Sequence, residues 1–85
     1  MTEKSLTINS KLPPKGDWNE TIALLVQRAN AFNSTVTARL DTKHANCKSI
    51  MGMISLGLER GRTVIIAADG DDEAEAVVAV AEVLG

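Results

Sequence analysis

The sequence predicts an α+β domain whose elements follow the order βαββαβα. Residues 4–8 and 35–40 alternate polar and apolar side chains, the pattern of strands with one buried face. Residues 63–67 form a near-continuous apolar run, which is typical of an interior strand, and helix-period stripes lie between these segments. A sheet with one covered side and one open side accounts for all three observations.

The first half of the chain supplies a strand, a loop and a helix. Strand 4–8 directs Leu6 and Ile8 to the core, and residues 9–16 form a loop because Pro13, Pro14 and Gly16 cannot extend a strand or helix. Asp17 begins the helix as an acidic N-cap, with Glu20 three residues later in a capping-box-like arrangement. The predicted core stripe of this helix contains Trp18, Ile22, Leu25, Ala29 and Phe32.

The second half begins with a hairpin. Strand 35–40 buries Val36, Ala38 and Leu40, residues 41–42 form a tight turn, and residues 43–47 form the weaker partner strand. A short helix at 49–57, a turn at 58–61 and strand 63–67 follow, and residues 69–72 lead into the last helix. That helix is predicted to bury a stripe of Ala74, Val77, Val78, Ala81 and Leu84.

Composition limits the classes of function. Eighty-five residues suit one domain spanning 1–85, and a net charge of −2 with a pI near 5.2 argues against direct nucleic-acid binding. One cysteine excludes an intrachain disulfide, and no Cys/His cluster suggests a metal or cofactor. Without a signal-like or membrane-spanning segment, the expected location is the cytoplasm, away from the membrane.

The segment from Lys48 to Gly57, KSIMGMISLG, is the most informative stretch. Ser49 is a favourable N-cap, Gly57 closes the helix, and Gly52 weakens it from within. Its apolar residues outnumber those that one face of a helix can bury. Some of them are therefore expected to face a partner, and at least two of Ile50, Met51 and Met53 should be exposed.

This segment, followed by TVIIAADG, closely resembles the regulatory-serine segment of the HPr family. The family comprises the phosphocarrier of the bacterial sugar phosphotransferase system and its catabolite-repression paralogue. The resemblance extends in element order from about residue 4 to residue 84. It implies an open-faced β-sandwich, in which three helices cover one face of a four-stranded antiparallel sheet.

The resemblance also locates the phosphocarrier site and shows that it is altered. In the family, a histidine at the start of the first helix accepts phosphate, and an arginine follows two residues later. Here Trp18 and Glu20 occupy those positions, and no histidine occurs between residues 1 and 31. Indole is not a nucleophile for phosphoryl transfer, and a carboxylate repels phosphate. We therefore expect a non-enzymatic protein that lacks carrier activity.

The regulatory segment points to docking on other proteins. The resemblance implies that an ATP-dependent kinase phosphorylates Ser49 and that a LacI-type transcription regulator binds the modified surface. The flanking recognition positions correspond to Lys48, Ile50, Met51, Met53 and Ile54. The paralogue further implies that the chain is either a monomer or a strand-exchanged dimer.

Two other functions stay open. The chain could be a phosphocarrier with an unrecognised acceptor, such as His44 or an aspartate, or a scaffold subunit that uses the apolar helix constitutively. We interpret His44 as an exposed strand residue and Cys47 as a core thiol, since neither belongs to a catalytic constellation. Trp18 is either a core anchor or an exposed residue of a remodelled interface. The acidic residues near Asp72 are interpreted as complements to a helix dipole.

Overall fold

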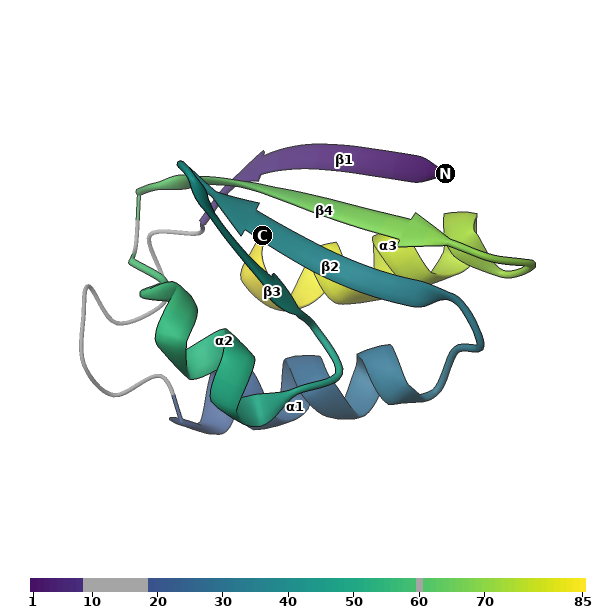
Figure 1. Ribbon diagram of the computed structural model, residues 1–85, viewed down its shortest axis with the longest axis horizontal. Coiled ribbons are helices and arrows are strands. Elements are labelled where there is room, and N and C mark those ends of the chain that lie inside the picture. The colour runs from purple at the N-terminus through teal and green to yellow at the C-terminus, as the bar shows by residue number, and fades with distance from the viewer. Residues whose placement is uncertain (9–18, 60) are drawn as a thin grey trace.

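The computed structural model describes residues 1–8, 19–59 and 61–85. Within these ranges the elements follow the predicted order (Figure 1): β1 Thr2–Thr7, α1 Asn19–Asn30, β2 Thr35–Leu40, β3 Lys43–Asn46, α2 Ile50–Leu56, β4 Thr63–Asp69 and α3 Glu73–Leu84. The Pro13-Pro14 loop, the Asp17 cap and Trp18 lie outside the described residues.

The four strands form one antiparallel sheet in the order β1-β4-β2-β3, so the most apolar strand, β4, is an interior strand as predicted. β1 begins at Thr2, two residues before the predicted start, because Thr2 pairs with Ala68. β4 likewise extends to Asp69, which pairs with Thr35. Both strands are longer than the apolar pattern indicates because backbone pairing continues through polar side chains.

All three helices cover the same face of the sheet (Figure 1). Helix α3 packs against β1 and β4, α2 packs against β2 and β3, and α1 contacts both of these helices. The covered face carries the predicted buried residues of β2 and, from β4, Val64, Ile66 and Ala68. The fold is therefore the α+β open-faced β-sandwich that the resemblance implies.

The predicted stripe of α1 is largely confirmed, since Ile22, Leu25 and Ala29 are buried. Phe32 lies just beyond the helix and is only partly buried against the core. Glu20 is exposed in the first turn of α1.

The predicted stripe of α3 is partly wrong. Val77, Ala81 and Leu84 are buried as expected, but Ala74 and Val78 are exposed, and Ala76 and Val80 take their places in the core. Eight of the twelve residues of this helix are Ala or Val, so many positions could belong to the buried stripe. The exposed Glu75 and Glu82 mark the polar side, on which Val78 also lies.

Polar contacts hold the start of α3 against other parts of the chain. Asp72 accepts hydrogen bonds from the backbone N–H groups of Asn33 and Ser34, each at 2.9 Å, and from the Ser34 hydroxyl. Glu73 accepts one from the Thr2 hydroxyl at 2.5 Å and pairs with the N-terminal ammonium at 3.2 Å. These bonds connect α3 to the α1–β2 turn and to β1.

Candidate functional site: the Ser49 segment and helix α2

Ser49 is the N-cap of α2, as predicted. Its backbone is extended at φ −113° and ψ 117°, and its Oγ accepts a hydrogen bond from the Gly52 N–H at 3.2 Å. The Ser49 carbonyl oxygen accepts the N–H of Met53 at 3.0 Å, which begins the helical pattern. At the other end, Gly57 adopts the left-handed conformation at φ 76°. The seven-residue helix is thus closed at both ends.

The residue before the cap connects α2 to the end of α1. The Lys48 Nζ donates a hydrogen bond to the Phe32 carbonyl oxygen at 2.9 Å, and the Lys48 N–H donates to the Asn46 Oδ1 at 2.9 Å. Asn30 at the end of α1 donates to the Lys48 carbonyl oxygen at 3.4 Å. The Lys48 ammonium therefore holds the segment that follows α1, an internal role that its prediction as a docking residue did not include.

The apolar residues of α2 divide into two sets. Ile50, Met51 and Ile54 are exposed, with 49%, 73% and 48% of their surface accessible. Met53 and Leu56 are buried in the core. Two of the three residues named in the exposure prediction therefore face solvent.

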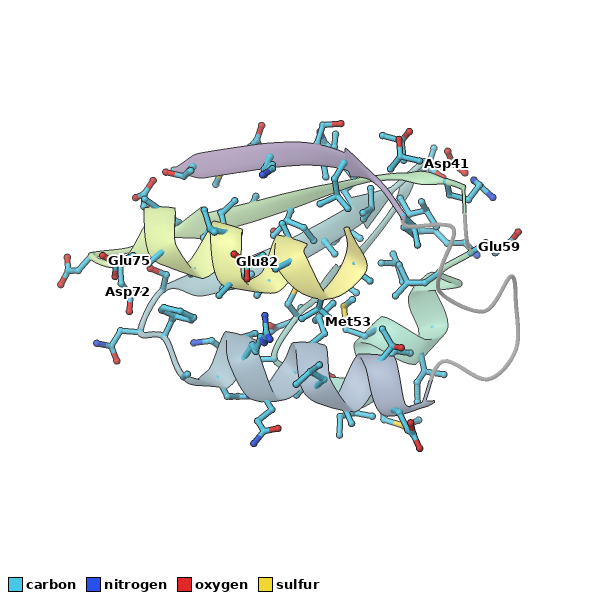
Figure 2. All side chains as sticks on the ribbon, turned by 180° about the vertical axis from the view of Figure 1, so that it is seen from behind. Asp41, Met53, Glu59, Asp72, Glu75 and Glu82 are labelled. Carbon is cyan, nitrogen blue, oxygen red and sulfur yellow. The ribbon has the colours of Figure 1, made fainter. Side chains whose placement is uncertain are left out.

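Met53 requires a correction, because it was predicted to belong to the docking surface. It is completely buried, and its side chain lies between the helices and the sheet (Figure 2). Its side chain packs in the hydrophobic core and does not contact solvent. We define the α2 patch as Ile50, Met51 and Ile54.

Gly52 lies close to the side chains of Ser49 and Ala45. A Cβ atom built at this position would lie 3.4 Å from both the Cβ and the Oγ of Ser49 and 3.7 Å from the Cβ of Ala45. These are ordinary van der Waals distances, so the position accepts a methyl group but has little further room. Any larger side chain would press on the Ser49 hydroxyl.

The other candidates from the sequence are structural or exposed residues. Cys47 is fully buried, and this burial raises the pKa of its thiol to about 12, which leaves it protonated and unreactive at neutral pH. His44 is exposed on β3, opposite Arg39 of β2. Among the described residues, no group of three or more His, Cys, Asp or Glu side chains is arranged to hold a metal ion.

The acidic residues at the start of α3 bond to distant parts of the chain. The hydrogen bond from the Ser34 hydroxyl, followed by that from the Asn33 N–H, lowers the pKa of Asp72. The Thr2 hydroxyl and then the N-terminal ammonium lower the pKa of Glu73. Both carboxylates are occupied by contacts within the chain. Figure 2 shows Asp72 where α3 begins, beside the turn that joins α1 to β2.

Two exposed apolar residues were not anticipated. Leu24 on α1 has 44% of its surface accessible, and Val78 on α3 has 48%. Leu24 belongs to a run of five apolar residues, 22–26, which is too wide for one face of a helix to bury completely. That run was the available signal for Leu24, and the available signal for Val78 was its position between Glu75 and Glu82 at helical spacing.

Comparison with family models and solved structures identifies relatives of this chain. The family model described as the PTS HPr component phosphorylation site matches residues 14–85. The chain belongs to the HPr family. Within the described part of the chain, no helix is long and apolar enough to cross a membrane.

Three solved HPr-family structures illustrate the similarity. HPr-C-His from Thermoanaerobacter tengcongensis is 38% identical over 99% of this chain and 91% of its own, with a TM-score of 0.86. The phosphocarrier protein HPr from Bacillus anthracis is 32% identical over 99% of this chain and 96% of its own, with a TM-score of 0.87. Crh from Bacillus subtilis, a catabolite-repression protein described as a swapped, intertwined dimer, is 37% identical over 93% and 90%, with a TM-score of 0.76.

The HPr family includes phosphocarrier proteins and a catabolite-repression relative. The only histidine in this chain is His44, on β3. Glu20 lies in the first turn of α1, while Trp18 precedes the described part of that helix.

Proposed function

We propose that this HPr-family protein is a regulatory docking module without phosphocarrier activity, that it binds protein partners through the α2 patch, and that phosphorylation of Ser49 controls this binding. The observation that carries the proposal is the α2 patch itself, three exposed apolar side chains next to the Ser49 cap. Exposed Met and Ile side chains suit an adaptable protein contact.

The composition of α2 supports a patch that is neutral until it is modified. The first turn of α2 has no acidic residue and the last turn has no basic residue. A phosphate on Ser49 would add about 1.5 to 2 negative charges beside Ile50 and Met51. By resemblance, the kinase is ATP-dependent and the partner of the modified surface is a LacI-type transcription regulator, with Lys48 and the α2 patch at the contact.

Loss of carrier activity is the second part of the proposal. It rests on the absence of any histidine between residues 1 and 31, with Trp18 and Glu20 at the positions of the phosphorylated histidine and its arginine. Incubation with phosphoenolpyruvate and the general phosphotransferase should leave the chain unlabelled. An acid-labile phosphate on the chain would instead favour the alternative, a phosphocarrier with another acceptor.

The kinase step is tested with a matched pair of serines on one segment. Treatment with the ATP-dependent kinase should add one phosphate to the wild type and to Ser55→Ala, and none to Ser49→Ala. Ser55 is exposed in the same helix, so it controls for general access to α2. If Ser49 stays unmodified in the folded wild type, the constitutive scaffold alternative replaces the regulated one.

Docking is tested with a pair of exposed apolar residues. Met51→Glu should weaken binding to the regulator, whereas Val78→Glu on α3 should leave it unchanged, and both should remain folded because the side chains are exposed. Equal binding by the two variants and the wild type would remove the α2 patch from the interface. Ser49→Asp should keep the cap and alter binding only partly, since aspartate carries less charge than phosphate.

We expect the chain to be either a monomer or a strand-exchanged dimer. Among the described residues, β1 is an edge strand that pairs with β4 alone, so the same pairing could be made with the β4 of a second chain. Light scattering over a range of protein concentrations distinguishes the two states.

A further inference from the structure

The open face of the sheet, opposite the helices, carries an ordered set of side chains. The strand register places Ser5, Ile65, Arg39 and His44 in one row across the four strands, because Ile65 pairs with both Ser5 and Arg39, and Arg39 pairs with His44. The next row contains Glu3, Ala67, Thr37 and Asn46.

Six residues of these two rows, together with Met1, line an open hollow of about 340 Å³. Thr37, Ile65 and Ala67 line its centre, Arg39 and His44 line it from β2 and β3, and Met1 and Glu3 line it from the start of the chain. The volume falls at the lower end of the range typical of small-molecule sites, about 300–1,000 Å³. It is much too small for a protein domain.

The basic end of the hollow has free donors. Within the described ranges, Arg39 makes no ion pair and no side-chain hydrogen bond, in contrast to Arg28 and Arg62, which both pair with carboxylates. A guanidinium group presents five N–H donors in a plane and binds a carboxylate or phosphate through two parallel bonds. His44, directly opposite on the neighbouring strand, adds a further ring donor within reach of the same ligand.

The acidic end limits which anion fits. The Glu3 carboxylate lies two strands away from Arg39 and also has no ion pair or hydrogen bond among the described residues. Two strand spacings place these groups about 10 Å apart across the sheet. A ligand that spans the hollow would meet donors at one end and an acceptor at the other.

We propose that this hollow binds a small organic anion that carries hydroxyl groups, with its carboxylate or phosphate on Arg39 and His44 and a hydroxyl donating to Glu3. The carbon body of the ligand lies over Ile65 and Ala67. This site lies on the opposite face from α2, so it is independent of the proposed docking function.

The test is a titration of the ¹⁵N-labelled full chain at fixed ionic strength, followed by NMR. The probes are glycerol 3-phosphate, gluconate, inorganic phosphate and glycerol, which separate a phosphate ligand from a carboxylate ligand and both from anion or hydroxyl binding alone. Saturable shifts at the amides of Arg39, His44 and Ile65 with at least one organic anion, and weaker binding of inorganic phosphate and glycerol, support the proposal.

A charge-matched pair of variants distinguishes the site from general electrostatics. Arg39→Gln should weaken binding about tenfold or more, because it removes the bidentate donor. Lys43→Gln removes the same charge from the same hairpin, but Lys43 does not line the hollow, so it should change the affinity by less than about twofold. Thermal melting confirms that both variants fold.

Two results would overturn the proposal. One is the absence of saturable shifts with either organic anion at tens of millimolar. The other is an equal loss of affinity in Arg39→Gln and Lys43→Gln, which would show binding to a diffuse positive potential. Neither result bears on Ser49 or on the α2 patch, so the docking function is judged separately.

Discussion

Replacing the two methionines that flank Gly52 by alanine tests how α2 is oriented. Met53 is completely buried, and Met53→Ala removes the Cγ, Sδ and Cε atoms from a close-packed core. The transfer and cavity terms together should cost about 2–5 kcal/mol of the free energy of unfolding. Met51 has 73% of its surface exposed, so Met51→Ala should change that free energy by no more than about 0.5 kcal/mol.

Urea unfolding followed by circular dichroism measures both values. With a slope of about 1–2 kcal/mol/M for a chain of this size, Met53→Ala should lower the midpoint by about 1–5 M. Total stability for such a domain is about 5–15 kcal/mol, so the variant should still fold in the absence of urea unless the wild type is at the lower limit. The midpoint of Met51→Ala should match that of the wild type.

The two variants should rank in the opposite order when binding to the regulator is measured. Met51→Ala should weaken binding at temperatures where it is fully folded, while folded Met53→Ala should bind through the same three exposed side chains. Equal midpoints for the two variants, or a larger loss in Met51→Ala, would refute the assignment of Met53 to the core and of Met51 to the surface.

Three further predictions concern glycines and the start of α3. Gly52→Ala should raise stability by about 0.5–1 kcal/mol in thermal melts, since the new methyl group meets no atom closer than 3.4 Å and alanine favours helix; a loss would show that the turn at Ser49 cannot widen. Gly70→Ala should lose about 1–3 kcal/mol, since its Cβ would lie 2.7 Å from the Ser34 Cα, and unchanged unfolding would contradict that contact. Asp72→Asn should lower the melting temperature at pH 7, and the difference from the wild type should shrink below about pH 4. Because the folded pKa of Asp72 is lowered, its contribution is complete above its ordinary pKa and is lost as pH falls through the folded value. A difference that stays constant down to pH 2 would show that the Asp72 charge does not stabilise the fold.

The sequence alone predicted the strands and α1, because their polar and apolar positions differ clearly. In β2, Val36, Ala38 and Leu40 alternate with Thr35, Thr37 and Arg39, so only one face can be buried. The predicted stripe of α1 is likewise buried at Ile22, Leu25 and Ala29, with Gln27 and Asn30 exposed, and the exposed Leu24 is the exception. For these elements, local pattern and tertiary burial agree.

The sequence prediction was partly wrong in α2 and α3, the two helices richest in apolar residues. In α3, the start of the helix is held by contacts of Asp72 with the Asn33–Ser34 turn, which is distant in sequence. In α2, Ser49 and Gly57 determine where the helix begins and ends, and packing against the sheet decides that Met53 and not Met51 is buried. Neither contact could be inferred from periodicity.

The open-face hollow was hidden for a different reason. Arg39, His44 and Glu3 are each ordinary polar residues of half-buried strands, and their sequence positions do not indicate that they line one space. They converge because the order β1-β4-β2-β3 places the strand after α2 between the first two strands of the chain. Sheet order, rather than any local motif, creates the site.

The buried side chains of α2 explain how phosphorylation of Ser49 could change binding without unfolding the helix. Loss of a serine cap costs about 1 kcal/mol, whereas burial of Met53 and Leu56 contributes about 1.5–3 kcal/mol for each side chain. The bonds of Lys48 to Phe32 and Asn46 further hold the start of α2 without using the Ser49 hydroxyl. If the proposed phosphorylation occurs, α2 should therefore stay in place, and the added charge should act on a partner at Ile50 and Met51. Hydrogen exchange of the α2 amides before and after kinase treatment tests this: protection should persist, and its loss would mean that the modification acts by unfolding the helix.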